Sequence, residues 1–330
     1  MIHTVFTFTM DVDPARLSDL QTALSVIQHD LPLDVQLRFS ELPMVHFASI
    51  FVFPPDPSGE AYPCSVPPPA KRRTVPYLVF ESNIDGTIEP YVDALLAKFP
   101  TGLAAILRCC KDGPQNGDVA AMKRYLLAHI VKPGAYHVGT PWRVVQRIND
   151  EAKLRDAIEE VADKVVAAAP KPVDPIAAHK QIQAAIRANP GFAWALQPAP
   201  KVTFLDKLRP WLPLIPHLPM FLVNTLLTIL MLPYLRYREM VDCEWKGDVD
   251  PKLQEALGAR EDFDTQNHMA NMSDLKPGFA RLTSAKAVLM LASINARLST
   301  KGKLAGIPSI HFAHWSLLDG GRRLLFCSNF

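Results

Sequence analysis

Two histidines stand in the same short phrase near opposite ends of the chain. His46 lies in Val45-His46-Phe47-Ala48, and His311 lies in Ile310-His311-Phe312-Ala313. An imidazole that points into an enclosed space can ligate a haem iron or contact a bound ligand. The alternative is a core histidine that completes a hydrogen bond to a neighbouring strand. We treat His46 and His311 as candidate ligand-binding residues, and haem is the cofactor that they suggest.

A second repeated phrase ends in an amide side chain. The first copy of this phrase is Leu78-Val79-Phe80-Glu81-Ser82-Asn83, and a similar phrase recurs as Leu324-Leu325-Phe326-Cys327-Ser328-Asn329. Asp85 follows the first copy. Asn and Asp side chains often bond their own backbone in turns and helix caps, which is the alternative to ligand binding here. Asn83, Asp85 and Asn329 join the two histidines as candidate ligand-binding residues.

These phrases belong to a longer series of expected elements. In the first copy, alternation predicts a strand over 3–10, Asp13-Pro14 predicts a helix start, and extended segments follow at 36–53 and 76–83. Helices are predicted near 87–99, 101–111 and 118–130, with a closing strand at 135–138. The order strand–helix–strand–strand–helix–strand is that of a ferredoxin-like α+β module.

The second copy begins near Asn267 and repeats the first strand, the first helix and the hairpin. Asp319-Gly320-Gly321 is expected to join strands 309–318 and 322–329. The helix is expected to turn one set of side chains inward, namely Leu282, Ala285, Leu289 and Ala292. Because the chain ends at Phe330, before the elements that complete the first copy, we expect a second module that is incomplete at the C-terminus. We expect a fragment of a longer protein rather than a module that has lost half its fold.

Both faces of the segment 45–53 are largely apolar, whereas an antiparallel sheet with one wet face should alternate cleanly. One face can be covered by the helices of its own module. The other face needs a second sheet, which the repeat supplies. We therefore expect tandem ferredoxin-like modules that form an α+β barrel, with His46 and His311 on equivalent strands. His314 faces opposite to His311 and is expected on the helix side or at an edge.

The expected modules divide the chain into four parts. The first ferredoxin-like module covers 1–142, and a helical connector with two charged, alanine-rich helices covers 143–200. A proline-rich apolar segment covers 201–240, and the truncated second module covers 241–330.

The apolar segment contains no charged residue from Pro210 to Leu235, about the length that a membrane span needs. Prolines recur at every third position from Pro210 to Pro219, which favours a polyproline-like or kinked entry, and an uninterrupted helix is left only from about Met220 to Leu232. Basic and aromatic residues at both borders are typical of the membrane interface. We expect an interfacial or re-entrant segment at the cytoplasmic face of a membrane, with contacts from Trp211, Phe221, Leu222, Leu226, Leu230 and Tyr234. The alternative is a buried helix or a hydrophobic dimer contact.

Composition and motifs exclude several functions. The 330 residues carry a net charge of only +2, which argues against a dedicated nucleic-acid binder. None of the five cysteines forms a C-x-x-C pair, so we expect reduced thiols on the cytoplasmic side. The sequence contains no P-loop, no G-x-G-x-x-G, no G-x-S-x-G and no H-E-x-x-H motif, so it predicts no particular reaction.

The repeated phrases resemble a little-characterised bacterial family. In that family, strands similar to Ile307-Pro308-Ser309-Ile310-His311-Phe312-Ala313-His314-Trp315 are followed by a phrase similar to Arg323-Leu324-Leu325-Phe326-Cys327-Ser328-Asn329, in tandem around a proline-rich apolar segment. The resemblance implies a fold but no activity. His314 stands where that family usually has Arg, and the family's Asp-Gly after the second Ser-Asn is missing.

At the level of architecture, tandem α+β barrels are also similar to the dye-decolourising peroxidase and chlorite dismutase group, which binds haem. The G-x-x-D-G motif of those peroxidases is not matched, because Ser82 stands where the motif needs glycine before Asp85-Gly86. No catalytic residue is carried over from this group.

The leading hypothesis is a membrane-associated protein whose duplicated barrel binds a small apolar molecule or supports assembly. Its expected partners are membrane lipid, a small-molecule ligand and a second copy of the chain, and nucleic acid is not expected. The alternative is a haem-dependent oxidoreductase of the peroxidase type, with His311 as the iron ligand.

Overall fold

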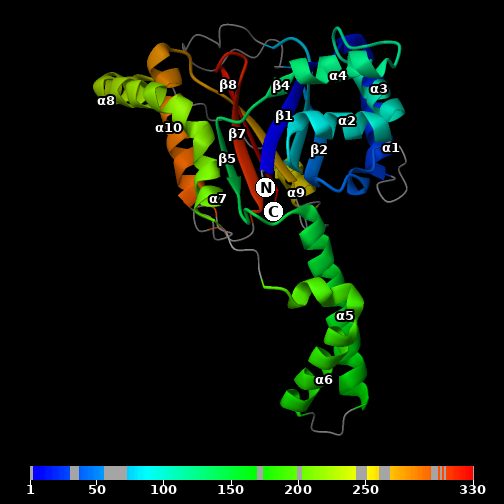
Figure 1. Cartoon of the computed structure of the whole chain (residues 1–330). Coiled ribbons are helices and arrows are strands. Elements are labelled where there is room, and N and C mark those ends of the chain that lie inside the picture. Colours follow the sequence, from blue (N-terminus) through cyan, green and yellow to red (C-terminus); the bar gives the residue numbers. More distant parts are fainter. Residues whose placement is uncertain are drawn as a thin grey trace. The chain divides into compact units, whose positions relative to one another are not determined.

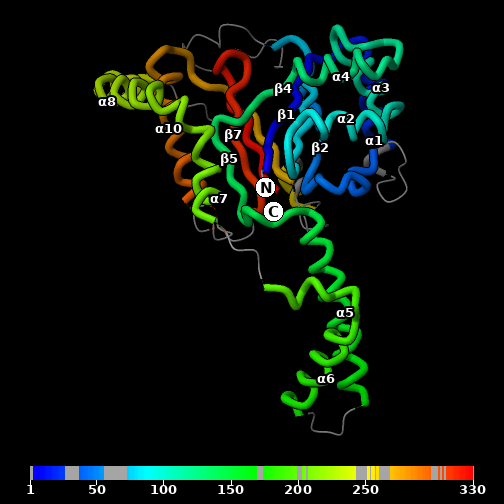
Figure 2. Tube along the Cα trace, in the orientation of Figure 1, coloured from blue at the N-terminus to red at the C-terminus, as the bar shows by residue number. Residues whose placement is uncertain are grey.

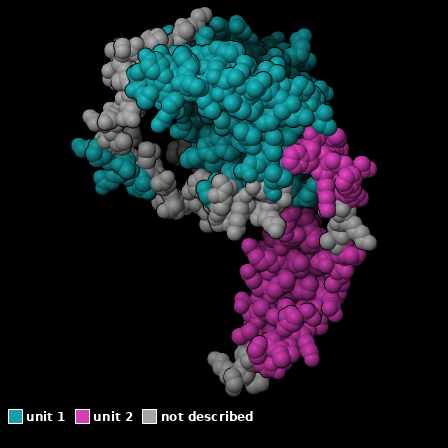
Figure 3. Space-filling view, turned by 90° about the vertical axis from the view of Figure 1, so that its left-hand side faces the viewer, with its two compact units in different colours: residues 1–142, 213–330 teal, residues 143–212 magenta. Residues whose placement is uncertain are grey.

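The computed structural model describes most of the chain, and Figure 2 follows its course. The described residues are 3–29, 37–55, 73–168, 174–198, 203–242, 251–259, 268–298, 304, 307 and 310–329. The chain forms two compact units, one made of residues 1–142 and 213–330 and the other of residues 143–212 (Figure 3). The first unit is a mixed α+β structure with two four-stranded antiparallel sheets, which confirms the predicted fold class at that level.

The first sheet contains β1 (His3–Asp11), β2 (Val45–Phe53), β3 (Tyr77–Asp85) and β4 (Ile130–Val131) in the order β2-β3-β1-β4. β1 and β3 pair along their whole length, with Phe8 opposite Phe80. The predictions for β1, β2 and β3 are confirmed. The predicted extended segment 36–53 is interrupted by a short 3₁₀ helix, η2 (Phe39–Glu41), and residues 30–36 lie outside the described part.

Helices cover one face of this sheet (Figure 1). Asp13 caps η1 (Pro14–Arg16) by accepting a hydrogen bond from the Ala15 backbone, and η1 continues into α1 (Leu17–His29). The remaining helices of this layer are α2 (Ile88–Lys98), α3 (Pro100–Leu107) and α4 (Val119–Ala128), close to their predicted ranges. Alternate strand residues meet them in one core that includes Phe6, Phe8, Met10, Leu78, Phe80, Ile84, Leu95 and Leu103.

The second sheet contains β5 (Ala135–Val138), β6 (His268–Asp274), β7 (Phe312–Leu318) and β8 (Arg323–Asn329) in the order β5-β7-β8-β6. The predicted hairpin between β7 and β8 is confirmed, and Asp319, Gly320 and Gly321 in its turn all have positive φ. The prediction that 135–138 closes the first sheet is wrong. These residues pair with β7, and the two-residue strand β4 takes the position beside β1.

The two sheets pack face to face. Their shared apolar cluster joins Tyr77 and Val79 of β3 to Leu318 at the end of β7 and to Leu325 and Cys327 of β8. These β3 residues alternate with those in the helix-side core, because successive strand residues point to opposite faces. The expectation that the second sheet covers the free face of the first is therefore confirmed, and the facing side chains define the space where polar groups are enclosed.

The helix α10 (Phe279–Leu298) lies beside β5 and is contacted by α8 (Leu218–Val241). The predicted inward stripe of α10 is confirmed in part, since Leu289 is buried and the other three residues of that set are half-buried. The buried side chains are Ala280, Thr283, Ala287, Leu289, Met290, Ser293 and Ala296. Because α10 packs against a strand and a helix at once, its burial does not follow one apolar stripe.

The apolar segment is helical nearly throughout, with α7 (Phe204–Leu208), η4 (Arg209–His217) and α8 in succession. The predicted polyproline-like entry is wrong, because Pro213 and Pro216 lie inside the 3₁₀ helix η4. The uninterrupted helix is also longer than predicted, because α8 continues through Pro233.

Asp242 fastens the end of α8. Its side chain is 3% exposed, and Oδ2 lies 3.2 Å from Lys276 Nζ and in contact with Arg281 Nη2. Its other oxygen lies 3.0 Å from Arg238 Nη2. Since Lys276 and Arg281 stand just before and within α10, this carboxylate holds the two helices together.

Replacing Asp242 with asparagine is expected to lower the free energy of unfolding by about 3 kcal/mol, because three basic groups lose a buried counter-charge. Urea unfolding followed by circular dichroism measures this change. Glu239→Gln in the same helix is the control: its pair with Arg236 is exposed at both side chains, and the expected change is below about 1 kcal/mol. Equal effects of the two substitutions would contradict the role given to Asp242.

The second unit is built from α5 (Val145–Ala168) and α6 (Pro175–Ala188), which contact each other, followed by η3 (Pro190–Leu196). Asp174 caps α6, and the Arg147 guanidinium lies 4.1 Å from the ring centre of Trp194. The two predicted connector helices are confirmed. In the first unit, a further short helix, α9 (Pro251–Gly258), precedes β6 in the sequence.

Candidate functional site

A buried carboxylate lies between the two sheets. Glu81 is on β3, and its side chain is 2% exposed. It points away from the helices because it follows Tyr77 and Val79 at alternate positions of the strand. A charged group at such a position needs several hydrogen-bond partners, since burying an unpaired carboxylate is very costly.

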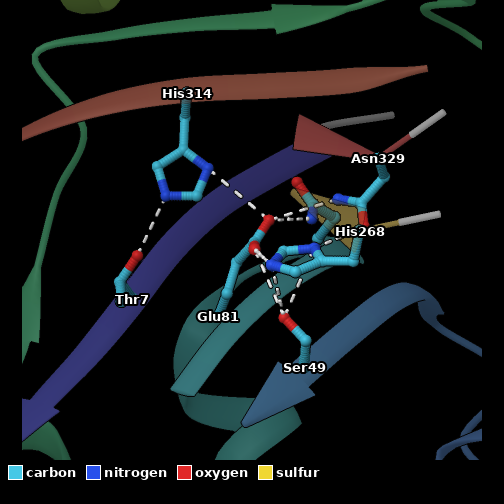
Figure 4. A network of polar contacts seen from close by, with 7 residues as sticks. Thr7, Ser49, Glu81, His268, His314 and Asn329 are labelled. Atoms are coloured by element: carbon cyan, nitrogen blue, oxygen red, sulfur yellow. Dashed lines mark hydrogen bonds and ion pairs between the residues drawn. The ribbon is translucent and has the colours of Figure 1, made fainter. Parts of the chain in front are cut away.

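Side chains from both sheets supply these partners (Figure 4). Glu81 Oε1 accepts hydrogen bonds from Asn83 Nδ2 at 2.9 Å and from Asn329 Nδ2 at 3.2 Å. Glu81 Oε2 accepts one from Ser49 Oγ at 3.4 Å and lies 3.2 Å from His268 Nε2. His268 Nδ1 lies 2.9 Å from Asn329 Oδ1. Residues of β2, β3, β6 and β8 thus converge on one carboxylate.

His314 belongs to the same group. It is fully buried, with Nε2 3.1 Å from Thr7 Oγ1 and Nδ1 3.6 Å from Glu81 Oε1 (Figure 4). The prediction that His314 lies on the helix side or at an edge is therefore wrong, because β7 is an inner strand and His314 faces the other sheet. Burial lowers the pKa of His314, and nearby His268 lowers it further, against the opposing attraction of Glu81.

The buried histidines predict a pH-dependent stability. Burial lowers the folded-state pKa of both His137 and His314, so just below the ordinary pKa of about 6.5 the unfolded chain binds more protons. Stability is then complete above that pH and falls as the pH drops below it, by up to about 1.4 kcal/mol per pH unit for each histidine. Urea unfolding at several pH values measures the slope. His314→Gln should reduce it, whereas exposed His217→Gln should leave it unchanged.

Cys327 lies next to Glu81 on the facing strand β8. It is fully buried, and burial raises the pKa of its thiol, with the Glu81 charge acting in the same direction. The ligand atoms of Glu81, His268 and Cys327 all lie within 4.8 Å of one another. Imidazole nitrogen, carboxylate oxygen and cysteine sulfur are the three ligand types of protein zinc sites.

A second group joins His3, His46 and Asp85. Asp85 Oδ1 lies 3.0 Å from His46 Nε2 and 3.2 Å from His3 Nδ1. Burial lowers the pKa of His3 to about 4, helped by His46 and opposed by Asp85, so this ring is neutral at pH 7. The Trp142 backbone donates a hydrogen bond to His3 Nε2 at 3.2 Å, which leaves the ring proton on Nδ1. A protonated Nδ1 has no lone pair, so His3 offers no ligand to a cation beside Asp85.

The sequence-predicted residues divide between these two groups. Asn83 and Asn329 bind Glu81, and His46 and Asp85 belong to the second group. His311 belongs to neither. It is exposed just before β7, and its ring lies nearly parallel to that of Phe47, with 6.3 Å between centres.

Sequence reasoning missed the central residues, namely His3, Thr7, Ser49, Glu81, His268 and Cys327. A signal was present for some of them. His3 and His268 are separated by the same offset as His46 and His311, and so are Ser49 and His314. The single charge inside the apolar phrase of β3 also marked Glu81 as a buried carboxylate.

These residues do not fit a haem. His311, the predicted iron ligand, is exposed rather than enclosed between the sheets. The enclosed rings of His268 and His314 lie against polar side chains, including Asn329 and Thr7, instead of an apolar slot for a porphyrin.

The outer surface of α8 is a separate feature. Its outward side chains are apolar and well exposed, for example Leu226 at 59% and Leu230 at 67%. The half-buried positions recur at spacings of three and four and are both polar and apolar, among them Asn224, Thr228, Leu227 and Met231. Because α8 contacts α10 (Figure 1), the helix has one partly covered side and one exposed apolar side. A helix at the surface of a soluble protein normally exposes charged and polar residues instead.

The stretch Arg209–Val241 is also long and apolar enough to cross a membrane by length and composition, and none of its most apolar part is buried. Exposed Lys207 and Arg209 lie at its start, and exposed Arg236 lies near its end with Tyr234 and Tyr237. Basic and aromatic residues at the ends of an apolar helix are typical of the water–lipid interface.

Comparison of the chain with protein-family models, with curated proteins and with solved structures found no match. The resemblances drawn from the repeated phrases therefore stay predictions. The contacts between the sheets and the surface of α8 are the observations from which a function can be inferred.

Proposed function

We propose that this chain is a membrane-associated protein that inserts the outer face of α8 into lipid. The observation that carries the proposal is the exposed apolar face of this helix, which includes Leu226 and Leu230. Exposed apolar surface of this extent is costly in water and is relieved by burial in an apolar phase.

The geometry favours a helix that lies in the interface rather than one that crosses. The 24 residues of α8 would span about 36 Å, enough for the hydrocarbon core. However, α8 contacts α10 and is joined to it through Asp242. A crossing α8 would bring α10 into the hydrocarbon, and α10 carries the charged Lys286 at an exposed position. An in-plane helix keeps these contacts in the headgroup region while the outer face enters the acyl chains. We place the protein at the cytoplasmic face, which suits the free Cys109, Cys110 and Cys327.

A contact with a second copy of the chain is the alternative use of the same surface. Exposed apolar side chains also occur on α10, including Val288 and Leu291. A dimer through these helices would bury them without lipid. The lipid interpretation is favoured by the basic and aromatic residues at the ends of the helix, which a dimer contact does not need.

We infer further that the body of the protein is a duplicated ferredoxin-like module. In support, the strand order β2-β3-β1 in one sheet corresponds to β7-β8-β6 in the other, and β1 and β6 are each followed by a helix. The polar groups around Glu81 do not favour the small apolar ligand expected from the sequence. In this proposal, the two sheets enclose a polar interior, and α8 attaches the protein to the membrane.

Flotation with lipid vesicles tests the proposal. The full chain is mixed with vesicles of phosphatidylcholine, or of phosphatidylcholine and phosphatidylserine in equal amounts, and centrifuged in a density gradient at low and high salt. The chain should float with both, because burial of apolar surface is insensitive to salt, and phosphatidylserine should add a salt-sensitive part. Protein that stays at the bottom in every condition would contradict the proposal, and a dimeric mass in that fraction would identify the alternative.

A further inference from the structure

Three side chains with different metal-binding atoms converge between the sheets, Glu81 from β3, His268 from β6 and Cys327 from β8. Their ligand atoms all lie within 4.8 Å of one another. We propose that these residues form a divalent-metal site and that Zn²⁺ is its ion. Zinc is bound in proteins by this set of imidazole nitrogen, carboxylate oxygen and thiolate sulfur.

Asn329 places two of these ligands in the orientation that a metal needs. Its amide nitrogen donates to Glu81 Oε1, so its carbonyl oxygen must be the atom that faces His268 Nδ1 at 2.9 Å. A carbonyl oxygen only accepts, so the His268 proton lies on Nδ1. Nε2 then carries the free lone pair, and it lies 3.2 Å from Glu81 Oε2. Metal-binding histidines usually donate their other ring N–H to an oxygen in this way.

The distances suit a shared ion. His268 Nε2 and Glu81 Oε2 lie 3.2 Å apart. Two ligand atoms about 2.1 Å from one tetrahedral zinc ion are about 3.4 Å apart, so this pair already has the required spacing. The competing occupant of the gap is a proton on Nε2, which would make His268 an imidazolium paired with Glu81. The experiment below separates these two cases.

Among the described residues, Oε1 of Glu81 accepts two hydrogen bonds and Oε2 only one, so Oε2 keeps a lone pair for the ion. Oε1 accepts from the amide groups of Asn83 and Asn329, which fix the plane of the carboxylate. Oε2 is contacted by Ser49 Oγ at 3.4 Å, and that hydroxyl also lies 3.1 Å from His268 Nε2 (Figure 4). Three protein ligands leave a fourth position for water or for the Ser49 hydroxyl.

Cys327 decides which ion is expected. Thiolate and imidazole ligands favour zinc and related transition metals, whereas Mg²⁺ and Ca²⁺ prefer oxygen ligands alone. Binding forms bonds from the ion to Cys327 Sγ, His268 Nε2 and Glu81 Oε2, and it releases the thiol proton to water. The His268 side chain is 23% exposed, so the ion can reach the site from that side.

Cobalt binding to the full chain tests this site without any assay of activity. The chain is freed of metal with a chelator and titrated with Co²⁺, which takes zinc positions and reports its ligands by absorption. One equivalent should bind with a near-ultraviolet charge-transfer band from the thiolate and visible bands of a tetrahedral ion, and Zn²⁺ should abolish both. A folded chain without these bands would overturn the proposal.

Two variants and one control locate the ion. Cys327→Ser should lose the charge-transfer band, whereas Cys109→Ser, which removes a buried thiol beside the helices, should keep it. A band that persists in Cys327→Ser overturns the proposal. If circular dichroism shows that Cys327→Ser does not fold, His268→Gln at the start of β6 replaces it in the test. This variant should bind cobalt at least about tenfold more weakly. Unchanged affinity would overturn the proposal.

Discussion

Replacing Glu81 with glutamine is expected to lower the free energy of unfolding by about 3 kcal/mol in the presence of a chelator. The carboxylate accepts hydrogen bonds at both oxygens, from Asn83 and Asn329 at one and from Ser49 at the other, beside His268. A glutamine amide has one oxygen and one NH₂ group. In one orientation its NH₂ group faces the NH₂ groups of Asn83 and Asn329; in the other it faces Ser49 and His268, and the bonds from both asparagines lose the charge that strengthens them. The loss is large because these groups are buried and cannot turn to water.

Urea unfolding followed by circular dichroism measures this effect. Glu89→Gln is the matched control, because Glu89 is an exposed carboxylate in the first turn of α2 in the same unit. Its replacement should cost less than about 1 kcal/mol. If Glu81→Gln were as stable as the parent chain, the contacts around Glu81 would not hold the two sheets together.

The double substitution Leu226→Lys with Leu230→Lys is expected to weaken vesicle binding at least a hundredfold. Both side chains are exposed on the outer face of α8, so the folded body should tolerate the change. Moving a lysine in place of a leucine into the hydrocarbon region costs about 3 kcal/mol per residue, more than the roughly 2.8 kcal/mol that a hundredfold change requires.

Vesicle flotation across a range of lipid concentrations measures this loss. Ile176→Lys is the control, because Ile176 is an equally exposed apolar residue that lies on α6, in the other compact unit. It should float like the parent chain. A double variant that floats as well as this control would place the membrane contact elsewhere or remove it.

The strands and most helices of the first unit were predictable because their patterns are local. β1, β3 and α2 each carry the spacing of their own element, and in the last of these Leu95 is buried. Pairing between strands is not local. The pattern of Ala135–Val138 predicts a strand, but it does not show whether that strand pairs with β7 or with β1. The segment was therefore assigned to the wrong sheet.

Helix faces were predictable only where one neighbour determines burial. α10 packs on β5 and on α8, and its close contacts use the small residues Ala280, Ala287, Ser293 and Ala296 in place of a leucine stripe. The outward apolar face of α8 was visible in the sequence as an uncharged segment. Only the contact with α10 shows which side of α8 faces outward.

The candidate site was only half predictable for a similar reason. The repeated phrases pointed to Asn83 and Asn329, and both bind the same carboxylate. The carboxylate itself was overlooked because Glu81 stands inside an apolar strand, and His268 because its role depends on a strand from the other sheet. Apart from the offset of the repeat, side chains that meet across two sheets carry no common spacing in the sequence.

The contact between the outer face of α8 and lipid is tested most directly by photo-crosslinking. A benzophenone amino acid is placed at Leu226, and in a parallel chain at Ile176, and each is irradiated with vesicles that contain a clickable phospholipid. The account predicts lipid adducts at position 226 and none at position 176. A chain labelled at 226 that crosslinks only to a second copy of itself, or acquires no lipid at all, would contradict it.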